Sequence, residues 1–119
     1  MSKIVIIGAG AMGSAFAVPC IDNEHVVSIV GTHLENDFID SLKINKRLHP
    51  GLDTIIPDGI NIFKFDKFDS VLTSDIDLIV LGISSKGIEW VSDQLSRIYK
   101  DFKLPKLLML TKGLSIYEN

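Results

Sequence analysis

The chain has 119 residues, of which 46% are hydrophobic and 23% are charged, and its formal net charge is -3. This length and composition are typical of one globular domain. The negative charge argues against a nucleic-acid or anionic-membrane partner, because both normally bind a basic face. The single cysteine, Cys20, excludes an intrachain disulfide and a multi-thiolate zinc site. No apolar run is long enough for a membrane span or a signal peptide, so we expect a cytoplasmic protein.

In chain order, the first half of the sequence reads as two strands, each followed by a helix. The apolar run at 3–7 predicts a strand that is buried on both faces. The next segment predicts a helix over 11–21, which Pro19 is expected to kink or end. A β-branched run predicts a strand over 26–30. Residues 35–46 predict an amphipathic helix with acids early and bases late.

The second half begins with a loop over 49–59, whose prolines and glycines predict an irregular conformation. Alternating apolar residues predict a short, more exposed strand over 60–65, followed by a short helix or turn at 68–73. The remaining apolar segments predict a buried strand, a helix and a last strand: 78–81, 87–99 and 107–110. Strands that alternate with helices predict an α/β fold, a doubly wound parallel sheet of the Rossmann type, as a single domain over residues 1–119.

The glycine-rich turn after the first strand is the most informative motif. It has the pattern G-x-G-x-x-G between a buried strand and a helix, which is the order that a dinucleotide pyrophosphate requires. Gly8 permits the tight turn, Gly10 lets the backbone approach the phosphates, and Gly13 lets the helix pack close to the strand. Ala11 and Met12 are expected to offer backbone N–H groups at the helix N-terminus. The alternatives are a turn that binds nothing and a Met12 side chain that fills the core.

The end of the second strand bears on the choice of cofactor, because ligands in doubly wound sheets lie beyond the carboxyl ends of the strands. Sites for NAD usually place an acid there, and sites for NADP place a basic group nearby. This chain has Thr32 and His33, with Glu35 slightly later, so the cofactor is NAD or NADP. Thr32 or His33 could bond a 2′-phosphate, and Arg47 could fold back toward it. A solvated His33 is the alternative.

Two further strand ends carry candidate residues. Ser84 lies where a nicotinamide ring would rest, and its alternative role, shared with Ser85, is to cap the following helix. Lys112 follows the last strand, where its ammonium could meet a phosphate or a polarised carbonyl; the alternative is a lysine in solvent. Trp90 is expected to pack on the sheet. The scattered histidines and the lone cysteine predict no metal site.

Five segments of the chain match one family in combination. They are the glycine turn, the end of the second strand, a Pro-Gly loop, the third buried strand and a Thr-Lys-Gly turn: 8–15, 29–33, 49–57, 77–85 and 110–114. With these segments the sequence resembles the N-terminal NAD(P)-binding domain of glycerol-3-phosphate dehydrogenase. The resemblance spans nearly the whole chain, and the combination is considerably more specific than the glycine motif alone.

The resemblance implies a reversible hydride transfer between NADH or NADPH and dihydroxyacetone phosphate, which gives sn-glycerol 3-phosphate, a phospholipid precursor. It implies that Lys112 is a catalytic residue at the junction of substrate and cofactor, and that Ala11, Met12 and Thr32 lie along the cofactor. The family often has a proline where this chain has Ser84. A second essential lysine and the residues that grip the substrate phosphate belong, in the family, to a helical C-terminal domain. We therefore expect a fragment of a longer, homodimeric enzyme that is inactive alone.

Two alternatives remain at this point. One is another dehydrogenase with the same cofactor domain, of the 2-hydroxyacid or ketopantoate type. An assay of dihydroxyacetone phosphate reduction by the full-length protein would distinguish it from a glycerol-3-phosphate dehydrogenase. The other is a non-catalytic domain that senses a dinucleotide. A reading frame that continues into a helical domain with a further lysine would count against the sensor.

Overall fold

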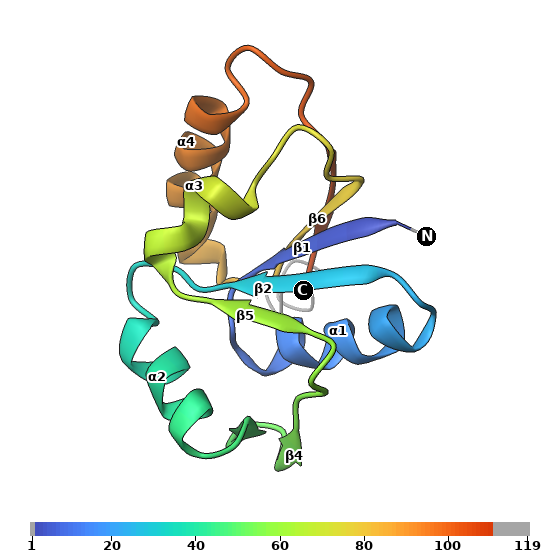
Figure 1. The fold of residues 1–119 in the computed structure, drawn as a ribbon. Helices are drawn as coiled ribbons and strands as arrows, with labels where there is room; N and C mark the ends of the chain where they lie inside the picture. The colour runs from blue at the N-terminus through green and yellow to red at the C-terminus, as the bar shows by residue number, and fades with distance from the viewer. Residues whose placement is uncertain (1, 111–119) are drawn as a thin grey trace, which may run out of the picture.

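The computed structural model describes residues 2–110, in which five parallel strands form one sheet in the order β5-β2-β1-β6-β7 (Figure 1). The strands are β1 (Lys3–Ile7), β2 (Val26–Val30), β5 (Asn61–Phe63), β6 (Leu78–Leu81) and β7 (Lys106–Met109). The order of the strands reverses between β1 and β6. In sheets of this kind, the crevice beyond the carboxyl ends of the two strands at the reversal is where ligands bind.

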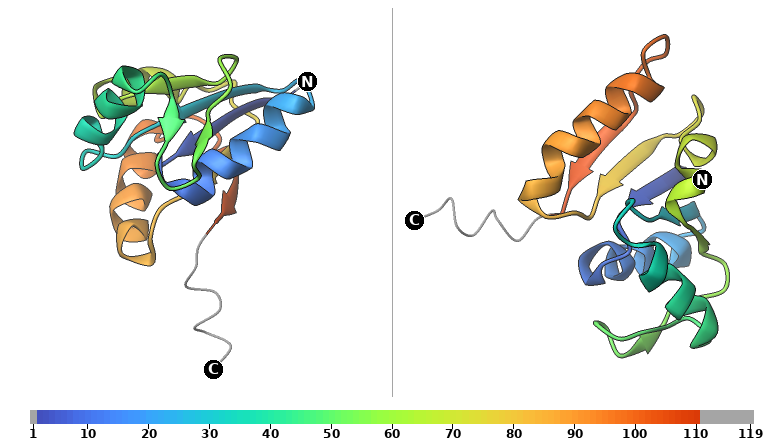
Figure 2. Two further views of the ribbon diagram at one scale, coloured as in Figure 1. Left: turned by 90° about the horizontal axis from the view of Figure 1, so that it is seen from below. Right: turned by 90° about the vertical axis from the view of Figure 1, so that its left-hand side faces the viewer.

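Helices cover both faces of the sheet (Figure 2). They are α1 (Ala11–Asp22), α2 (Asn36–Ile44), α3 (Phe68–Val71) and α4 (Ile88–Ile98), with single 3-10 turns at Phe65–Lys67 and Ser85–Gly87. Alternate residues of β1 point to opposite faces. Ile4 and Ile6 enter the core beneath α1 and α2, whereas Val5 and Ile7 enter the core beneath α3 and α4. No helix within residues 2–110 has the length and apolar character of a membrane span.

The structure confirms the α/β class and the doubly wound parallel sheet. The strands predicted over 3–7, 26–30 and 78–81 have the same bounds in the structure. Each of these three strands is mainly apolar, lies in the centre of the sheet with most of its residues buried, and is followed directly by a glycine. The predicted strand over 60–65 is shorter, because the chain turns into a 3-10 helix at Phe65.

The sequence predicts that Pro19 kinks or ends the first helix, but the helix does not end there. The helix α1 continues to Asp22. Proline lacks an N–H group, but at this position only one hydrogen bond near the end of the helix is lost. The Pro19 carbonyl oxygen accepts hydrogen bonds from both the backbone N–H of Asn23 at 3.1 Å and its side-chain Nδ2 at 2.7 Å, which closes the helix terminus.

The loop predicted to be irregular over 49–59 contains an antiparallel hairpin, formed by β3 (Leu48–His49) and β4 (Thr54–Ile55). Arg47 holds it together. Its Nε donates to the carbonyl of Ile56 at 3.1 Å, and its guanidinium also donates to the carbonyl of Pro57 at 2.9 Å. Arg47 therefore does not fold back toward the end of β2, as the sequence left possible, because its guanidinium bonds carbonyls that directly follow the hairpin.

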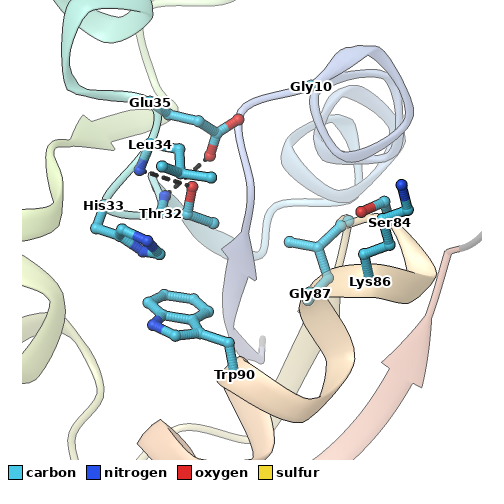
Figure 3. Close-up of a pocket in the computed structure, with 11 residues that line it drawn as sticks. Gly10, Thr32, His33, Leu34, Glu35, Ser84, Lys86, Gly87 and Trp90 are labelled. Carbon is cyan, nitrogen blue, oxygen red and sulfur yellow. Dashed lines mark hydrogen bonds between the residues drawn. The ribbon is translucent and has the colours of Figure 1, made fainter.

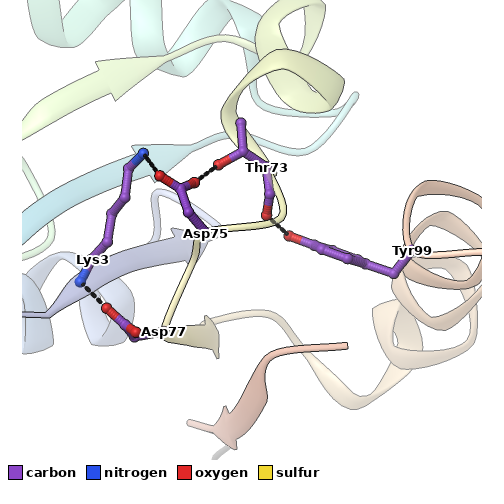
Figure 4. A network of polar contacts seen from close by, with 5 residues as sticks. All are labelled: Lys3, Thr73, Asp75, Asp77 and Tyr99. Carbon is purple, nitrogen blue, oxygen red and sulfur yellow. Dashed lines mark hydrogen bonds and ion pairs between the residues drawn. The ribbon is translucent and has the colours of Figure 1, made fainter. Parts of the chain in front are cut away.

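A polar network fastens the amino-terminal edge of the sheet (Figure 4). The backbone N–H of Lys3 donates to Asp77 at 2.8 Å, and its ammonium donates to Asp75 at 2.9 Å. The Thr73 hydroxyl donates to the other oxygen of Asp75. The Tyr99 hydroxyl donates to the Thr73 carbonyl at 2.8 Å, and burial raises the pKa of Tyr99 to about 12. These groups lie at the edge opposite the glycine turn, so they belong to the scaffold.

Candidate functional site

The turn between β1 and α1 brings glycines into backbone contact with the end of β6. Gly8 has a φ of +111°, and a Cβ at this residue would lie 2.4 Å from the carbonyl oxygen of Gly82. A Cβ at Gly13 would lie 2.8 Å from the carbonyl oxygen of Gly8. A side chain at either position would collide with backbone. These two glycines therefore allow α1 to begin directly against the paired ends of β1 and β6.

Gly10 has a different environment from the other two glycines of the motif. It is the N-cap of α1, with an extended backbone, and a Cβ built on it would meet no atom within 4 Å. Ala11 and Met12 follow as the first two residues of the helix. The N–H groups of a first helical turn have no acceptor within the helix, and they carry the positive end of its dipole. The space beside Gly10 is thus open to an anion.

A cavity of about 730 Å³ opens at this edge of the sheet (Figure 3). This volume lies within the range of small-molecule binding sites, roughly 300–1,000 Å³. The cavity is lined by the glycine turn, the loop after β2 and the segment between β6 and α4. Among its lining residues are four that the sequence analysis selected: Gly10, Thr32, His33 and Ser84. The fold therefore brings three separate strand ends together.

The carboxylate of Glu35 joins two of these strand ends. Ala9 donates its backbone N–H to both oxygens of Glu35, at 3.2 and 3.1 Å, and Thr32 donates its N–H to Oε1 at 2.9 Å. Glu35 is the N-cap of α2, and its N–H bonds the Thr32 carbonyl at 3.0 Å. Glu35 follows the end of β2 by several residues, and this tight turn lets its carboxylate reach back over the end of that strand. The spacing of three residues to Thr32 is the signal that could have indicated it.

An aromatic wall closes the cavity on one side. The rings of His33 and Trp90 have centroids 4.8 Å apart, and Phe65 lies 5.9 Å from His33 and 5.7 Å from Trp90. Figure 3 shows the indole beneath the imidazole, both beside the cavity. The sequence predicts that Trp90 packs on the sheet but does not predict its contact with His33. Its position in the first turn of α4, at the ligand edge, was the available signal.

Ser84 lies at the end of the β6 segment and lines the cavity. Ser84 stands at the N-cap of the 3-10 turn Ser85–Gly87 that leads into α4, which agrees with the alternative role in position. Its side chain makes no capping hydrogen bond, and the N-cap of α4 itself is Gly87. Lys86, in the same segment between β6 and α4, is exposed and also lines the cavity. Lys112 lies outside the described residues, so its expected role stays a prediction.

The fold and the site define the class of this protein. Five parallel strands in doubly wound order, a glycine turn at the strand reversal and a cavity beyond it make a Rossmann-like α/β domain. A family model described as the NAD-dependent glycerol-3-phosphate dehydrogenase N-terminus matches residues 3–119. The chain belongs to this family, which confirms the resemblance found in the sequence.

Individual relatives agree with this assignment. The NADP(+)-dependent glycerol-3-phosphate dehydrogenase of Archaeoglobus fulgidus is 33% identical over 116 residues, which are 98% of this chain and 33% of that protein. The NAD(P)+ glycerol-3-phosphate dehydrogenase of Oceanobacillus iheyensis is 30% identical over 114 residues, 96% of this chain and 31% of that protein. The chain thus spans about a third of the length of these relatives.

A solved structure shares the fold. The crystal structure of glycerol-3-phosphate dehydrogenase from Coxiella burnetii matches with a TM-score of 0.71 over 94% of this chain and 33% of that chain, at 20% identity. At this level of identity the likeness concerns the fold alone.

Proposed function

We propose that this chain is the cofactor-binding part of an NAD(P)-dependent glycerol-3-phosphate dehydrogenase. The whole enzyme would interconvert dihydroxyacetone phosphate and sn-glycerol 3-phosphate by hydride transfer. The observation that carries the proposal is the open space beside Gly10, at the mouth of a cavity where the sheet order reverses. Membership of the dehydrogenase family supports it.

The pyrophosphate of the cofactor would bind at the glycine turn. Gly8 and Gly13 bring the backbone into position, and Gly10 leaves room for a phosphate group. The N–H groups at Ala11 and Met12 would then donate to phosphate oxygens, supported by the positive end of the helix dipole. In this arrangement the pyrophosphate is held by backbone N–H groups and the helix dipole rather than by a flexible basic side chain.

The adenosine would lie between the loop after β2 and the start of α4. The rings of His33 and Trp90, whose planes are tilted by 43° to each other, offer aromatic faces there. Thr32 and Glu35 lie beside them, where the ribose is expected in this fold. A fixed carboxylate accepts hydrogen bonds from ribose hydroxyls and repels a 2′-phosphate, so Glu35 favours NAD(H) over NADP(H).

The reacting end of the cofactor would lie toward Ser84, at the carboxyl end of β6. When bound, the dinucleotide supplies the hydride. Lys112 is proposed, from the family resemblance, to hold its ammonium against the substrate carbonyl oxygen and to stabilise the charge that develops there. A cytoplasmic location and a homodimeric full-length enzyme belong to the same proposal and rest on the resemblance.

Calorimetric titration of the purified protein with NADH and NADPH tests the binding site, and reduction of dihydroxyacetone phosphate by the full-length protein tests the activity. Gly10→Val places a side chain in the open space, so it is expected to abolish binding while the fold is kept. Ala15→Val, at an exposed position of the same helix, is the matched control and is expected to bind normally. Unchanged affinity in Gly10→Val would overturn the phosphate site. NADH binding without reduction of dihydroxyacetone phosphate would instead favour a sensing domain.

A further inference from the structure

The peptide groups of Ala9 are held on both sides by side chains from three different elements. The N–H of Ala9 donates to Glu35. The carbonyl oxygen of Ala9 accepts a hydrogen bond from the Ser14 hydroxyl at 3.2 Å and lies 2.9 Å from Nε2 of His49. Ala9 stands between the first two glycines of the motif, and its own side chain is buried. The middle of the glycine turn is therefore fixed by residues outside the motif.

His49 has a defined role in this arrangement because its two ring nitrogens have different partners. Only 2% of its surface is exposed. The N–H of Gly51 donates to Nδ1 at 3.0 Å, so Nδ1 carries a lone pair and the proton of the neutral ring is on Nε2. Nε2 therefore donates to the Ala9 carbonyl. The ring of Phe38 packs edge-on at 5.2 Å and holds the imidazole in place.

The β3–β4 hairpin brings His49 to this position. Gly51, in the hairpin loop, lies against both the imidazole and the start of α1. A Cβ at Gly51 would be 3.1 Å from Cε1 of His49 and 3.3 Å from the Cβ of Ala11. The loop thus lies so close between the ring and the helix that a Cβ at Gly51 would be tighter than ordinary van der Waals contact. The hairpin is a support for the glycine turn as well as a connection between strands.

The geometry of the peptide bond carries this support to the cavity. The carbonyl of Ala9 and the N–H of Gly10 belong to one planar trans peptide, so they point in opposite directions. Bonds from His49 and Ser14 hold the carbonyl toward the hairpin and α1. The N–H of Gly10 consequently points away from them, and Gly10 lines the cavity. Within residues 2–110, no group accepts a hydrogen bond from this N–H.

We propose that His49 is a positioning residue for the pyrophosphate site. Its Nε2–H, together with the Ser14 hydroxyl, fixes the Ala9–Gly10 peptide so that the Gly10 N–H is already oriented for a phosphate oxygen. Donors that are oriented before binding lose less conformational freedom when the ligand arrives. The inference rests on the proposed function, because it concerns the same dinucleotide site.

Two substitutions separate the donor of His49 from its bulk. His49→Phe keeps a ring against Phe38 and removes the N–H. His49→Gln keeps an N–H at a similar reach and removes the ring. His25→Gln is the matched control, because the His25 ring accepts a hydrogen bond from the Ser2 N–H at the far end of the sheet. Each full-length variant is titrated with NADH, with ADP, which retains the pyrophosphate, and with adenosine, which has none.

His49→Phe is expected to weaken NADH and ADP by about tenfold, which corresponds to roughly 1.4 kcal/mol, and to change adenosine affinity by no more than about twofold. His49→Gln is expected to recover most of the affinity, and His25→Gln to match the unmodified protein. If His49→Phe fails to fold, Ser14→Ala removes the second donor to the same carbonyl and is expected to weaken ADP selectively. In NMR spectra, inorganic pyrophosphate is expected to shift the Gly10 amide in His49→Gln but not in His49→Phe.

Two results would overturn the inference while the proposed function stands. One is an NADH-binding protein in which His49→Phe and Ser14→Ala bind ADP as tightly as the unmodified chain. The other is an equal loss for adenosine and ADP, which indicates a general structural role. Failure of the unmodified protein to bind NADH would overturn the proposed function, and this inference with it.

Discussion

Glu35 bonds Ala9 across the mouth of the cavity, and its two carboxylate oxygens lie 3.2 and 3.1 Å from the Ala9 backbone nitrogen. This contact places a negative charge where the adenosine ribose is expected. We predict that the protein binds NADH more tightly than NADPH, and that Glu35→Gln reduces this preference. The change should be about fivefold, near 1 kcal/mol, because the site is partly solvated. Calorimetry with both cofactors measures the ratio. Glu89→Gln, at an exposed position of α4, is the control, and an unchanged ratio in Glu35→Gln would exclude the role.

Trp90 is the single tryptophan of the chain, so its fluorescence reports on one place. Because the indole forms the aromatic wall with His33, we predict that NADH and adenosine both change its emission, whereas nicotinamide mononucleotide does not. The measurement is a fluorescence titration with the three ligands. A response to the mononucleotide but not to adenosine would place the cofactor in the opposite direction.

Gly13 is predicted to be essential for stability. In Gly13→Ala the new Cβ would lie 2.8 Å from a backbone carbonyl oxygen, so the free energy of unfolding should fall by about 1–3 kcal/mol. In the control, Gly59→Ala, the nearest atom is 3.4 Å away in the Ile21 side chain. That variant should be unchanged or slightly more stable, because alanine restricts the unfolded chain. Urea denaturation measures both, and equal stabilities would contradict the prediction.

Tyr99 is predicted to make stability fall in alkaline solution. Burial raises the pKa of this hydroxyl from 10.0 to about 12 in the folded protein. Between these values the unfolded chain releases the proton while the folded chain keeps it, so the folded state is destabilised as pH rises. The stabilisation of the folded state by the protonated Tyr99 is complete below pH 10 and is lost as pH passes about 12. Unfolding measured across this interval should show a smaller slope in Tyr99→Phe than in Tyr117→Phe, which removes the other tyrosine.

The central strands could be predicted with their bounds because their signal is local. Each is a short apolar run that a glycine follows at once, as in Ile7–Gly8 and Val30–Gly31. The β3–β4 hairpin could not be predicted in this way. Its shape depends on the Arg47 guanidinium, which bonds carbonyls about ten residues further along the chain. A pattern of prolines and glycines does not contain that contact.

The candidate site shows the same division. The glycine turn is a contiguous motif, and its strand–turn–helix context was visible in the sequence. Glu35 contacts Ala9 across 26 residues, and His49 contacts the same residue across 40. Neither contact with Ala9 follows from a periodicity or a local spacing, and the three-residue spacing between Thr32 and Glu35 indicates only the local turn. Both appear only when the sheet has brought α2 and the hairpin beside the end of β1.

The bonds from His49 and Ser14 to the Ala9 carbonyl have a consequence for protein engineering. A designer who transplants residues 8–13 into another parallel sheet would transfer all three glycines of the motif. The recipient would lack the imidazole and the hairpin loop that seats it. Such a graft is expected to reproduce the path of the chain and still bind nucleotides poorly, unless the hairpin is moved as part of the same unit.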